Sequence, residues 1–488
     1  MNLTQALDRC PTGLLIDGVR RPAADGRTLT VHDPATTEPL AEVASAAEQD
    51  AVAAVAAAAR AQSGWAATPP RQRSVVLRRA WELMTERAEY FATLISAENG
   101  KALPDARAEV AYAAEFLRWY AEEAVRLEGT VTRAPAGGYR ILVDRVPIGV
   151  AVLVTPWNYP AAMATRKIGP ALAAGCAVVL KPASDTPLTA LAVGALLLEA
   201  GVPAGVVNVL PADRSGPVVS ALLAQPAVRK LSFTGSTEVG RVLLRAAADR
   251  VLNTSMELGG NAPFLVLADA DLDAAVEGAM LAKMRNGGEA CTAANRFYVH
   301  ESLADAFGAR LAAAMEALRV GPGLDPDTEV GPLVNAGAVA KVDELVVDAV
   351  ERGARVLTGG YAPERVGHYY TPTVLDRVAP DSALLTEEIF GPVAPLVRFE
   401  DEAEAVALAN ATEYGLVSYL YTRDLGRGLA VAGRLESGMV GLNRGLVSDP
   451  AAPFGGVKQS GIGREGGHEG VLEYMEAKYI ATAWQDAV

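Results

Sequence analysis

Cysteine and histidine are scarce in this chain, whose 488 residues include only three cysteines and four histidines. Cys10, Cys176 and Cys291 are far apart and odd in number, which argues against a disulfide framework and fits a reducing compartment. So few histidines, with no cluster of cysteines, also argue against a zinc site. We therefore expect neither a metal centre nor a disulfide.

Positive charge is also in deficit, because 44 basic residues face 58 acidic residues and the net charge is −14. This balance argues against a nucleic-acid partner. The longest uncharged stretch, residues 147–165, carries three prolines that would break a membrane helix. The first ten residues show no basic start followed by an apolar run, so we predict no secretory signal. The expectation is a soluble cytoplasmic protein without a membrane partner.

Hydrophobic residues are abundant and make up half of the chain, so a large core can form. A chain of this length exceeds one typical core and predicts two or three domains. Short strands are expected at 14–18 and 29–31, followed by helices at 46–62, 71–99 and 105–127. Residues 129–146 combine two alternating segments with a glycine turn, which predicts a hairpin.

From residue 149 the pattern alternates between strands and helices, which predicts a parallel sheet covered by helices. The strands are expected at 150–154, 177–180, 206–210, 230–233 and 264–267, with helices that include 166–172 and 188–200. Ligands bind at the carboxyl ends of such strands, where Thr155, Lys181, Thr234 and Gly235 fall. A second series follows residue 257, with helices at 304–319, 338–353 and 402–410 and a strand at 355–357.

One cysteine stands in a chemically suggestive setting, the segment MRNGGEACTAANR at residues 284–296. Gly287 and Gly288 allow a sharp turn that could present the thiol of Cys291. Small neighbours leave room for a substrate, which makes this thiol a candidate nucleophile. The alternative is that Cys291 is an ordinary buried residue, as free cysteines usually are.

A glycine-bearing turn follows the expected strand at 230–233, with the sequence GSTEVG at residues 235–240. Its glycines would let the backbone approach a pyrophosphate, and the start of the next helix favours an anion. With two glycines it is not the common dinucleotide motif G-x-G-x-x-G. A plain strand–helix turn is the alternative.

Six short sequence blocks, one of which contains GSTEVG, follow one another along the chain: VTPWNYP (154–160), VLKPAS (179–184), FTGSTEVG (233–240), MELGGN (256–261), EEIFGP (387–392) and PFGGVKQSG (453–461). This ordered set resembles the aldehyde dehydrogenase superfamily from about residue 15 to the C-terminus. The surroundings of Arg166, Arg285 and Cys291 look most like the succinate-semialdehyde dehydrogenase branch.

The resemblance implies an α/β fold with a Rossmann-type cofactor domain (1–128 and 147–257) and an α/β catalytic domain (258–445). It also implies small oligomerisation elements (129–146 and 468–488), in which the hairpin and a strand at 477–484 pack against a neighbouring subunit of a homodimer or homotetramer. The alternative is a hairpin that is covered within its own subunit.

The resemblance also implies a nicotinamide cofactor, held by Thr155, Pro156, Trp157, Lys181, Ser184, Gly235, Ser236, Leu258, Glu388 and Phe390. Trp157 and Ser236 would lie by the pyrophosphate, Lys181 and Ser184 by the adenine-side ribose, and Glu388 by the nicotinamide ribose. The alternatives are a solvated Lys181 and an exposed Glu388 at a helix start. Serine at position 184 leaves space for a 2′-phosphate beside Lys181, so we predict NADP, with NAD as the alternative.

The implied chemistry is aldehyde oxidation by covalent catalysis. Cys291 would attack the aldehyde, Asn158 and the Cys291 backbone N–H would hold the oxyanion, and Glu257 would activate water to hydrolyse the thioester. Asn158 could instead be a structural turn residue, and Glu257 a helix-terminal charge. A carboxylate at position 257 argues against transfer of the acyl group to coenzyme A, which needs no such base.

The implied substrate is an acidic aldehyde. In the succinate-semialdehyde branch, residues matching Arg166, Arg285 and Ser448 hold the distal carboxylate, and an arginine fork suits that group. The expected reaction is succinate semialdehyde to succinate. Alternatives are another aldehyde such as glutarate semialdehyde, structural ion pairs for the arginines, or a non-catalytic protein on this fold. This sequence departs from the pattern of that branch at two positions: Ala293, where some members carry a second cysteine, and Arg444, which is less usual there.

Overall fold

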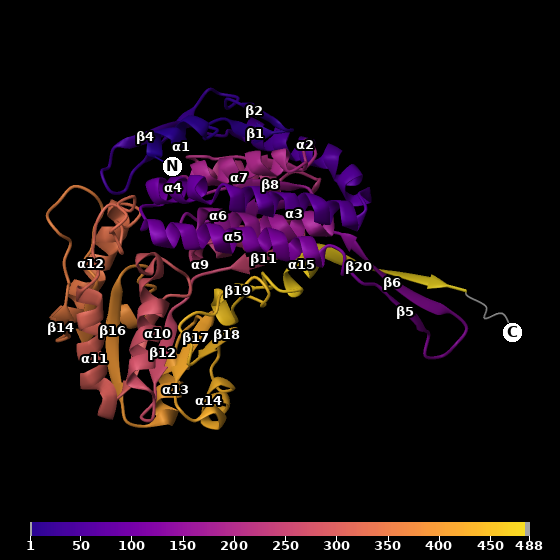
Figure 1. Cartoon of the computed structure of the whole chain (residues 1–488). Coiled ribbons are helices and arrows are strands. Elements are labelled where there is room, and N and C mark those ends of the chain that lie inside the picture. The colour runs from indigo at the N-terminus through magenta and orange to yellow at the C-terminus, as the bar shows by residue number, and fades with distance from the viewer. Residues whose placement is uncertain (1, 484–488) are drawn as a thin grey trace.

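The computed structural model describes residues 2–483, which form two large sheets, each with its own helices, and a protruding arm (Figure 1). The first sheet has the strand order β19-β11-β10-β7-β8-β9-β1-β2. Its strands are β1 (Leu14–Ile16), β2 (Val19–Arg21), β7 (Val150–Val154), β8 (Val178–Lys181), β9 (Val207–Val209), β10 (Val228–Thr234), β11 (Asn253–Glu257) and β19 (Gly461–Ile462). Strands β7 to β11 run parallel, and β1, β2 and β19 are antiparallel additions.

The first sheet is buried on both faces at its centre, because every residue of β7 and β8 is buried. One face packs against α2 (Glu48–Ala67), α8 (Ser215–Leu223) and α9 (Thr237–Ala248). The other packs against α3 (Pro70–Glu86), α4 (Ala88–Asn99), α5 (Leu103–Glu123), α6 (Pro160–Ala174) and α7 (Pro187–Glu199). A short N-terminal helix, α1 (Leu3–Arg9), lies beside α4, and β3 (Thr28–His32) pairs with β4 (Pro39–Ala44).

The single helix expected at 71–99 is wrong, because the chain forms two helices, α3 and α4, that meet at Arg87. Arg87 has φ −110° and ψ 26°, outside the helical region, and its guanidinium pairs with Glu199 at the end of α7. Neither glycine nor proline marks the break, so the helical pattern of the sequence runs through it.

The second sheet has the order β14-β15-β16-β13-β12-β17-β18, parallel except for β14. Its strands are β12 (Ala262–Val266), β13 (Ala294–His300), β14 (Arg355–Thr358), β15 (Thr373–Asp376), β16 (Val393–Phe399), β17 (Val417–Tyr421) and β18 (Met439–Leu442). Its helices are α10 (Leu272–Met284), α11 (Glu301–Glu316), α12 (Ala336–Glu351), α13 (Glu402–Asn410) and α14 (Leu425–Ala432). The expected boundary at residues 257 and 258 falls between β11 of one sheet and β12 of the other, and the domain assignment itself stays a prediction.

The arm is a three-stranded antiparallel sheet that projects from the body (Figure 1). The expected hairpin is present as β5 (Thr130–Arg133) and β6 (Arg140–Pro147), and β20 (Met475–Thr482) pairs along the whole of β6. Trp484, the last residue of the expected C-terminal strand, lies outside the described residues. The short helix α15 (Glu469–Leu472) leads into β20. No described helix is both long and apolar enough to cross a membrane.

Candidate active site

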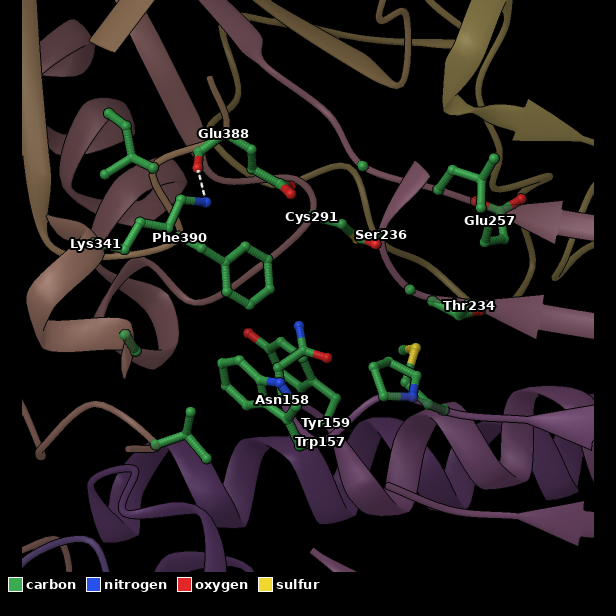
Figure 2. A pocket seen from close by; sticks show the side chains of 18 of the residues that line it. Trp157, Asn158, Tyr159, Thr234, Ser236, Glu257, Cys291, Lys341, Glu388 and Phe390 are labelled. Atoms are coloured by element: carbon green, nitrogen blue, oxygen red, sulfur yellow. Dashed lines mark hydrogen bonds between the residues drawn. The ribbon is translucent and has the colours of Figure 1, made fainter. Parts of the chain in front are cut away.

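A cavity of about 350 Å³ lies where the two sheets face each other, and it brings together most of the residues singled out in the sequence (Figure 2). Its lining includes Pro156, Trp157, Asn158, Arg166, Gly235, Ser236, Glu257, Leu258, Cys291, Glu388 and Phe390. Thr155, Lys181, Ser184, Arg285 and Ser448 are not among the lining residues. Five further residues line the cavity without a role predicted from the sequence: Tyr159, Met163, Asn335, Lys341 and Phe454.

Cys291 is carried by a tight loop between α10 and β13. Asn286 and Gly287 have φ values of 52° and 58°, and Gly288 has φ 81°, so three successive residues adopt left-handed angles. A side chain at Gly288 would overlap the carbonyl oxygen of Gly391, which leaves glycine as the residue that fits. The loop presents Cys291 to the cavity (Figure 2), where its side chain is partly exposed.

The thiol lies deep below the protein surface even though the cavity reaches it. Burial raises the pKa of Cys291 to about 12, and Arg166 is the charge that most opposes this rise. The resting cysteine is therefore a thiol at neutral pH. Its proton must therefore pass to a base as the reaction begins, because the thiolate is the nucleophile.

Asn158 is held beside this loop through both its backbone and its side chain. Its Nδ2 donates to the carbonyl oxygen of Glu289 over 3.0 Å, and its own carbonyl accepts from Lys101 Nζ (2.6 Å) and Asn286 Nδ2 (3.1 Å). The second N–H of the Asn158 amide and the backbone N–H of Cys291 have no protein acceptor within residues 2–483. Two N–H groups are thus available beside the nucleophile, as an oxyanion hole requires.

Glu257 ends strand β11 and points into the cavity (Figure 2), so it is not the helix-terminal charge considered as an alternative. Its carboxyl group is buried, and no group within residues 2–483 hydrogen-bonds to Oε2. Burial, followed by the nearby charge of Glu465, raises the pKa of Glu257 well above its ordinary value. A carboxyl group with a raised pKa is a stronger base toward water.

Arg166 has a structural partner as well as a place in the cavity lining. Its Nε lies 3.5 Å from Glu465 Oε2, and Nη2 donates to the Tyr112 hydroxyl over 2.9 Å. The guanidinium also stacks 3.9 Å from the centroid of the Phe454 ring. Glu465 is itself paired with Lys167 over 2.5 Å, so two cations share one carboxylate. The ion pair considered for Arg166 therefore exists, and no pattern in the sequence points to Glu465 as its partner.

Arg285 begins the nucleophile loop and lies near the hydroxyl groups of Tyr159 and Tyr419. Burial lowers the pKa of Arg285, but Tyr159, Tyr419 and Asp105 outweigh this effect and the pKa is raised overall. The Tyr419 hydroxyl donates to the carbonyl of Thr292, next to Cys291, over 2.8 Å. Ser448 is half-buried and is not among the residues that line the cavity.

The other end of the cavity has features that suit a nicotinamide ribose. Glu388 accepts from the backbone N–H of Gly260 over 3.2 Å, and burial raises the pKa of Glu388 to about 7. Lys341 Nζ donates to the Glu388 carbonyl over 2.6 Å (Figure 2). Glu388 is half-buried and starts no helix, so the exposed helix-start alternative is wrong. Trp157 and Phe390 meet edge to face across the cavity, 5.4 Å between centroids.

A second cavity of about 620 Å³ adjoins the first, since Val334 and Asn335 line both. Ser184 and Asp185 line this second cavity. Lys181 ends strand β8 and is buried, which rules out the solvated alternative, and this burial lowers the pKa of Lys181 to about 8. In the first cavity, Ser236 caps the N-terminus of α9 by accepting from Val239 N over 3.4 Å. Two adjoining cavities, the first with a helix N-terminus in its lining, fit a dinucleotide.

Comparison with known proteins agrees with this geometry. The model of the aldehyde dehydrogenase family matches residues 21–480. A succinate-semialdehyde dehydrogenase of Paenarthrobacter nicotinovorans is 56% identical, covering 91% of this chain and 99% of that protein. A glutarate-semialdehyde dehydrogenase of Pseudomonas putida is 50% identical, covering 95% and 96%.

Among solved structures, an NADP-dependent enzyme of Escherichia coli superimposes with a TM-score of 0.96 at 48% identity, covering 97% of this chain and 98% of that one. The α/β fold expected from the sequence is confirmed by this match. Since the family model spans nearly the whole chain and relatives share about half of its residues, the chain belongs to the aldehyde dehydrogenase family.

Proposed function

We propose that this aldehyde dehydrogenase oxidises succinate semialdehyde to succinate. The observation that carries the proposal is the pair of arginines, with Arg166 in the cavity lining and Arg285 at the start of the nucleophile loop. Burial raises the pKa of the Tyr112 hydroxyl and the charges of Arg166 and Arg285 both oppose that rise, so both guanidinium groups lie near this hydroxyl. A short substrate with a carboxylate at its far end would place that group there. The Paenarthrobacter relative supports this substrate, and the Pseudomonas relative keeps glutarate semialdehyde as the alternative.

In the first step the sulfur of Cys291 attacks the aldehyde carbon and forms a thiohemiacetal. The Asn158 amide and the Cys291 backbone N–H donate to the oxygen, on which negative charge develops. The nicotinamide cofactor, when bound, supplies the acceptor for the hydride that leaves the aldehyde carbon. Cys291 then carries the acyl group as a thioester.

In the second step Glu257 takes a proton from water, the hydroxide attacks the thioester carbon, and the carboxylate product leaves Cys291 as a thiol. The unpaired, buried Oε2 of Glu257 supports this role, because it is free to accept the proton. A base at this position favours hydrolysis over transfer to coenzyme A. We place the enzyme in the cytoplasm because its three cysteines are unpaired, as a reducing compartment maintains them.

We propose NADP as the preferred cofactor and NAD as a weaker one. Pro156, Trp157, Gly235, Ser236, Leu258 and Phe390 would hold it along the first cavity, with Glu388 on the nicotinamide ribose. Ser184 and Lys181 would hold the adenine-side ribose, and Thr155, whose N–H donates to the Lys181 carbonyl over 3.2 Å, would fix the strand end. Serine adds no negative charge beside a 2′-phosphate. The NADP-dependent Escherichia coli structure supports the assignment.

We propose a homodimer or homotetramer that assembles through the arm. Val131, Leu142 and Ile480 lie directly opposite one another across the three strands and form one apolar row. Val131 and Ile480 are 62% and 44% exposed in the single subunit. An apolar row on a projecting sheet suits a partner surface.

The two steps separate in a variant that lacks the base. Glu257→Gln should give one burst of reduced cofactor, close to one per active site, followed by slow turnover, because acylation proceeds while hydrolysis stalls. Stopped-flow absorbance of reduced nicotinamide measures both phases. Cys291→Ala should remove both, since no covalent intermediate forms. Normal turnover by Glu257→Gln would assign the base to another group.

The cofactor proposal predicts that Ser184→Glu shifts the preference from NADP toward NAD. The added carboxylate would accept from both ribose hydroxyls and repel a 2′-phosphate. The ratio of kcat/KM for the two cofactors measures the shift. Asp185 already carries a negative charge nearby and accepts from Asn335 over 3.4 Å, so the unmutated ratio is the reference. An unchanged ratio would contradict this account.

The substrate proposal predicts that Arg285→Ala lowers kcat/KM for succinate semialdehyde by a factor on the order of 30 or more. Losing one partner of a charge-assisted pair costs about 2–5 kcal/mol, and about 1.4 kcal/mol is tenfold. Butanal has no carboxylate, so its lower kcat/KM should change little. Arg118→Ala, on the exposed side of α5, is the matched control.

Arg166→Ala should reduce the rates with both aldehydes, because it also removes the contact with Phe454 and leaves Glu465 with one cation. Arg285→Ala therefore decides the substrate class. If butanal is the better substrate of the unmutated enzyme, or if both substrates lose rate equally in Arg285→Ala, the semialdehyde assignment is wrong.

The assembly proposal predicts that Val131→Glu lowers the mass measured by light scattering toward that of one subunit. A carboxylate in the apolar row would have to be buried against the partner. Val356→Glu, at an exposed position of edge strand β14, should leave the mass unchanged. A monomeric unmutated protein, or an equal effect of both substitutions, would count against the arm as the interface.

A further inference from the structure

The start of α5 faces the active site with three ionisable residues spaced four apart. Lys101 lies just before the helix, and Asp105 and Glu109 follow in its first two turns. Asp105 and Glu109 therefore share one face of the helix, and Lys101 reaches that face because its Nζ donates to Glu109. Lys101 and Glu109 are buried and Asp105 is half-buried, so the charges face the protein interior and not solvent.

Lys101 and Glu109 hold the segment that carries Asn158. Lys101 Nζ donates to the Asn158 carbonyl and to Glu109 Oε2, each over 2.6 Å. Glu109 Oε1 accepts from the backbone N–H groups of Ala161 (2.9 Å) and Ala162 (3.2 Å), at the start of α6. The backbone is therefore fixed at Asn158 and again three residues later.

Asp105 holds the other half of the site. Its Oδ2 accepts from the backbone N–H of Asn286 over 2.8 Å, in the loop that carries Cys291. Asn286 Nδ2 in turn donates to the carbonyls of Asn158 (3.1 Å) and Glu289 (3.0 Å). The Asn158 carbonyl thus accepts from Lys101 on one side and from the nucleophile loop on the other. One helix face contacts both segments that supply the two N–H donors.

We propose that Lys101, Asp105 and Glu109 are positioning residues that set the geometry of the oxyanion hole. They hold Asn158 and the Cys291 loop in a fixed position relative to each other, beside the start of α5. The inference rests on the proposed roles of Asn158 and the Cys291 N–H as oxyanion donors. None of the three residues lines the cavity, so they act through the groups they hold and not on the substrate.

Two physical arguments support a positioning role. Burying an ion pair such as Lys101–Glu109 removes both charges from water, and such pairs often contribute little to stability, so a stabilising role alone does not account for it. The reaction rate, by contrast, depends steeply on the position of the oxyanion donors, because a displacement of about 1 Å can lower the rate about a hundredfold. The directed hydrogen bonds of the charged Lys101, Asp105 and Glu109 side chains supply that precision.

Two reactions of Cys291 separate positioning from general damage. Acylation by p-nitrophenyl acetate without cofactor converts the ester carbonyl oxygen to an oxyanion and releases p-nitrophenolate, which is measured by absorbance. Alkylation by iodoacetamide forms a carbon–sulfur bond and releases iodide without any oxyanion. The first reaction needs the donors in place, and the second needs only an accessible thiolate.

Lys101→Met and Glu109→Gln should lower the acylation rate on the order of 10- to 100-fold and leave alkylation within about threefold. Glu115→Gln, on the exposed side of the same helix, is the matched control and should change neither rate. Lys101→Arg, which keeps the cation, should recover part of the acylation rate.

Asp105→Ala tests the nucleophile-loop side and leaves the buried Lys101–Glu109 pair intact, so it remains informative if the other variants do not fold. It should likewise lower acylation more than alkylation. Unchanged acylation in the folded variants, or an equal loss in both reactions, would overturn the inference. An unmutated enzyme that is alkylated but not acylated would instead contradict the proposed oxyanion hole itself, and this inference with it.

Discussion

Burial controls the protonation of the groups that the chemistry uses. Burial is the largest cause of the raised pKa values of Cys291, Glu257 and Glu388. In that environment the Cys291 thiol stays protonated and the carboxyl groups become better bases. The charges of Arg166 and Lys167 also act strongly there, because buried charges are poorly screened. The same environment explains why the buried Asn158 carbonyl accepts two hydrogen bonds, because an unpaired polar group would be costly there.

Arg166 illustrates how one buried cation can serve structure and chemistry together. It balances Glu465 jointly with Lys167, and it lies over Phe454 at the cavity wall. Lys167 is the closer partner of Glu465, so this carboxylate does not depend on Arg166 alone for a cation. An ion pair and a substrate ligand are alternative roles in the sequence-based prediction for Arg166, but the two roles are compatible.

The sequence predicted the parts of the site that are local. Residues at strand ends, such as Thr155 and Gly235, follow from alternation of strands and helices, and the turn at Gly287 and Gly288 follows from glycine alone. The association of Asn158, Glu257 and Cys291 came from resemblance, since they are supplied by different parts of the fold. The burial of Glu465 and Lys101 could not be predicted from the sequence, because most charged residues lie at the surface and only tertiary contacts bury these two. The break at Arg87 was missed for a related reason, because its partner Glu199 lies on another helix.

The arm also constrains the order in which the chain can fold. Strand β6 pairs along its whole length with β20, which is the last described strand, more than three hundred residues later. Contacts of such high sequence separation form slowly, and during synthesis β6 must wait until nearly the entire chain has emerged. Until then one edge of β6 is open to any other strand. The subunit therefore completes its arm last, after both large sheets have had time to form.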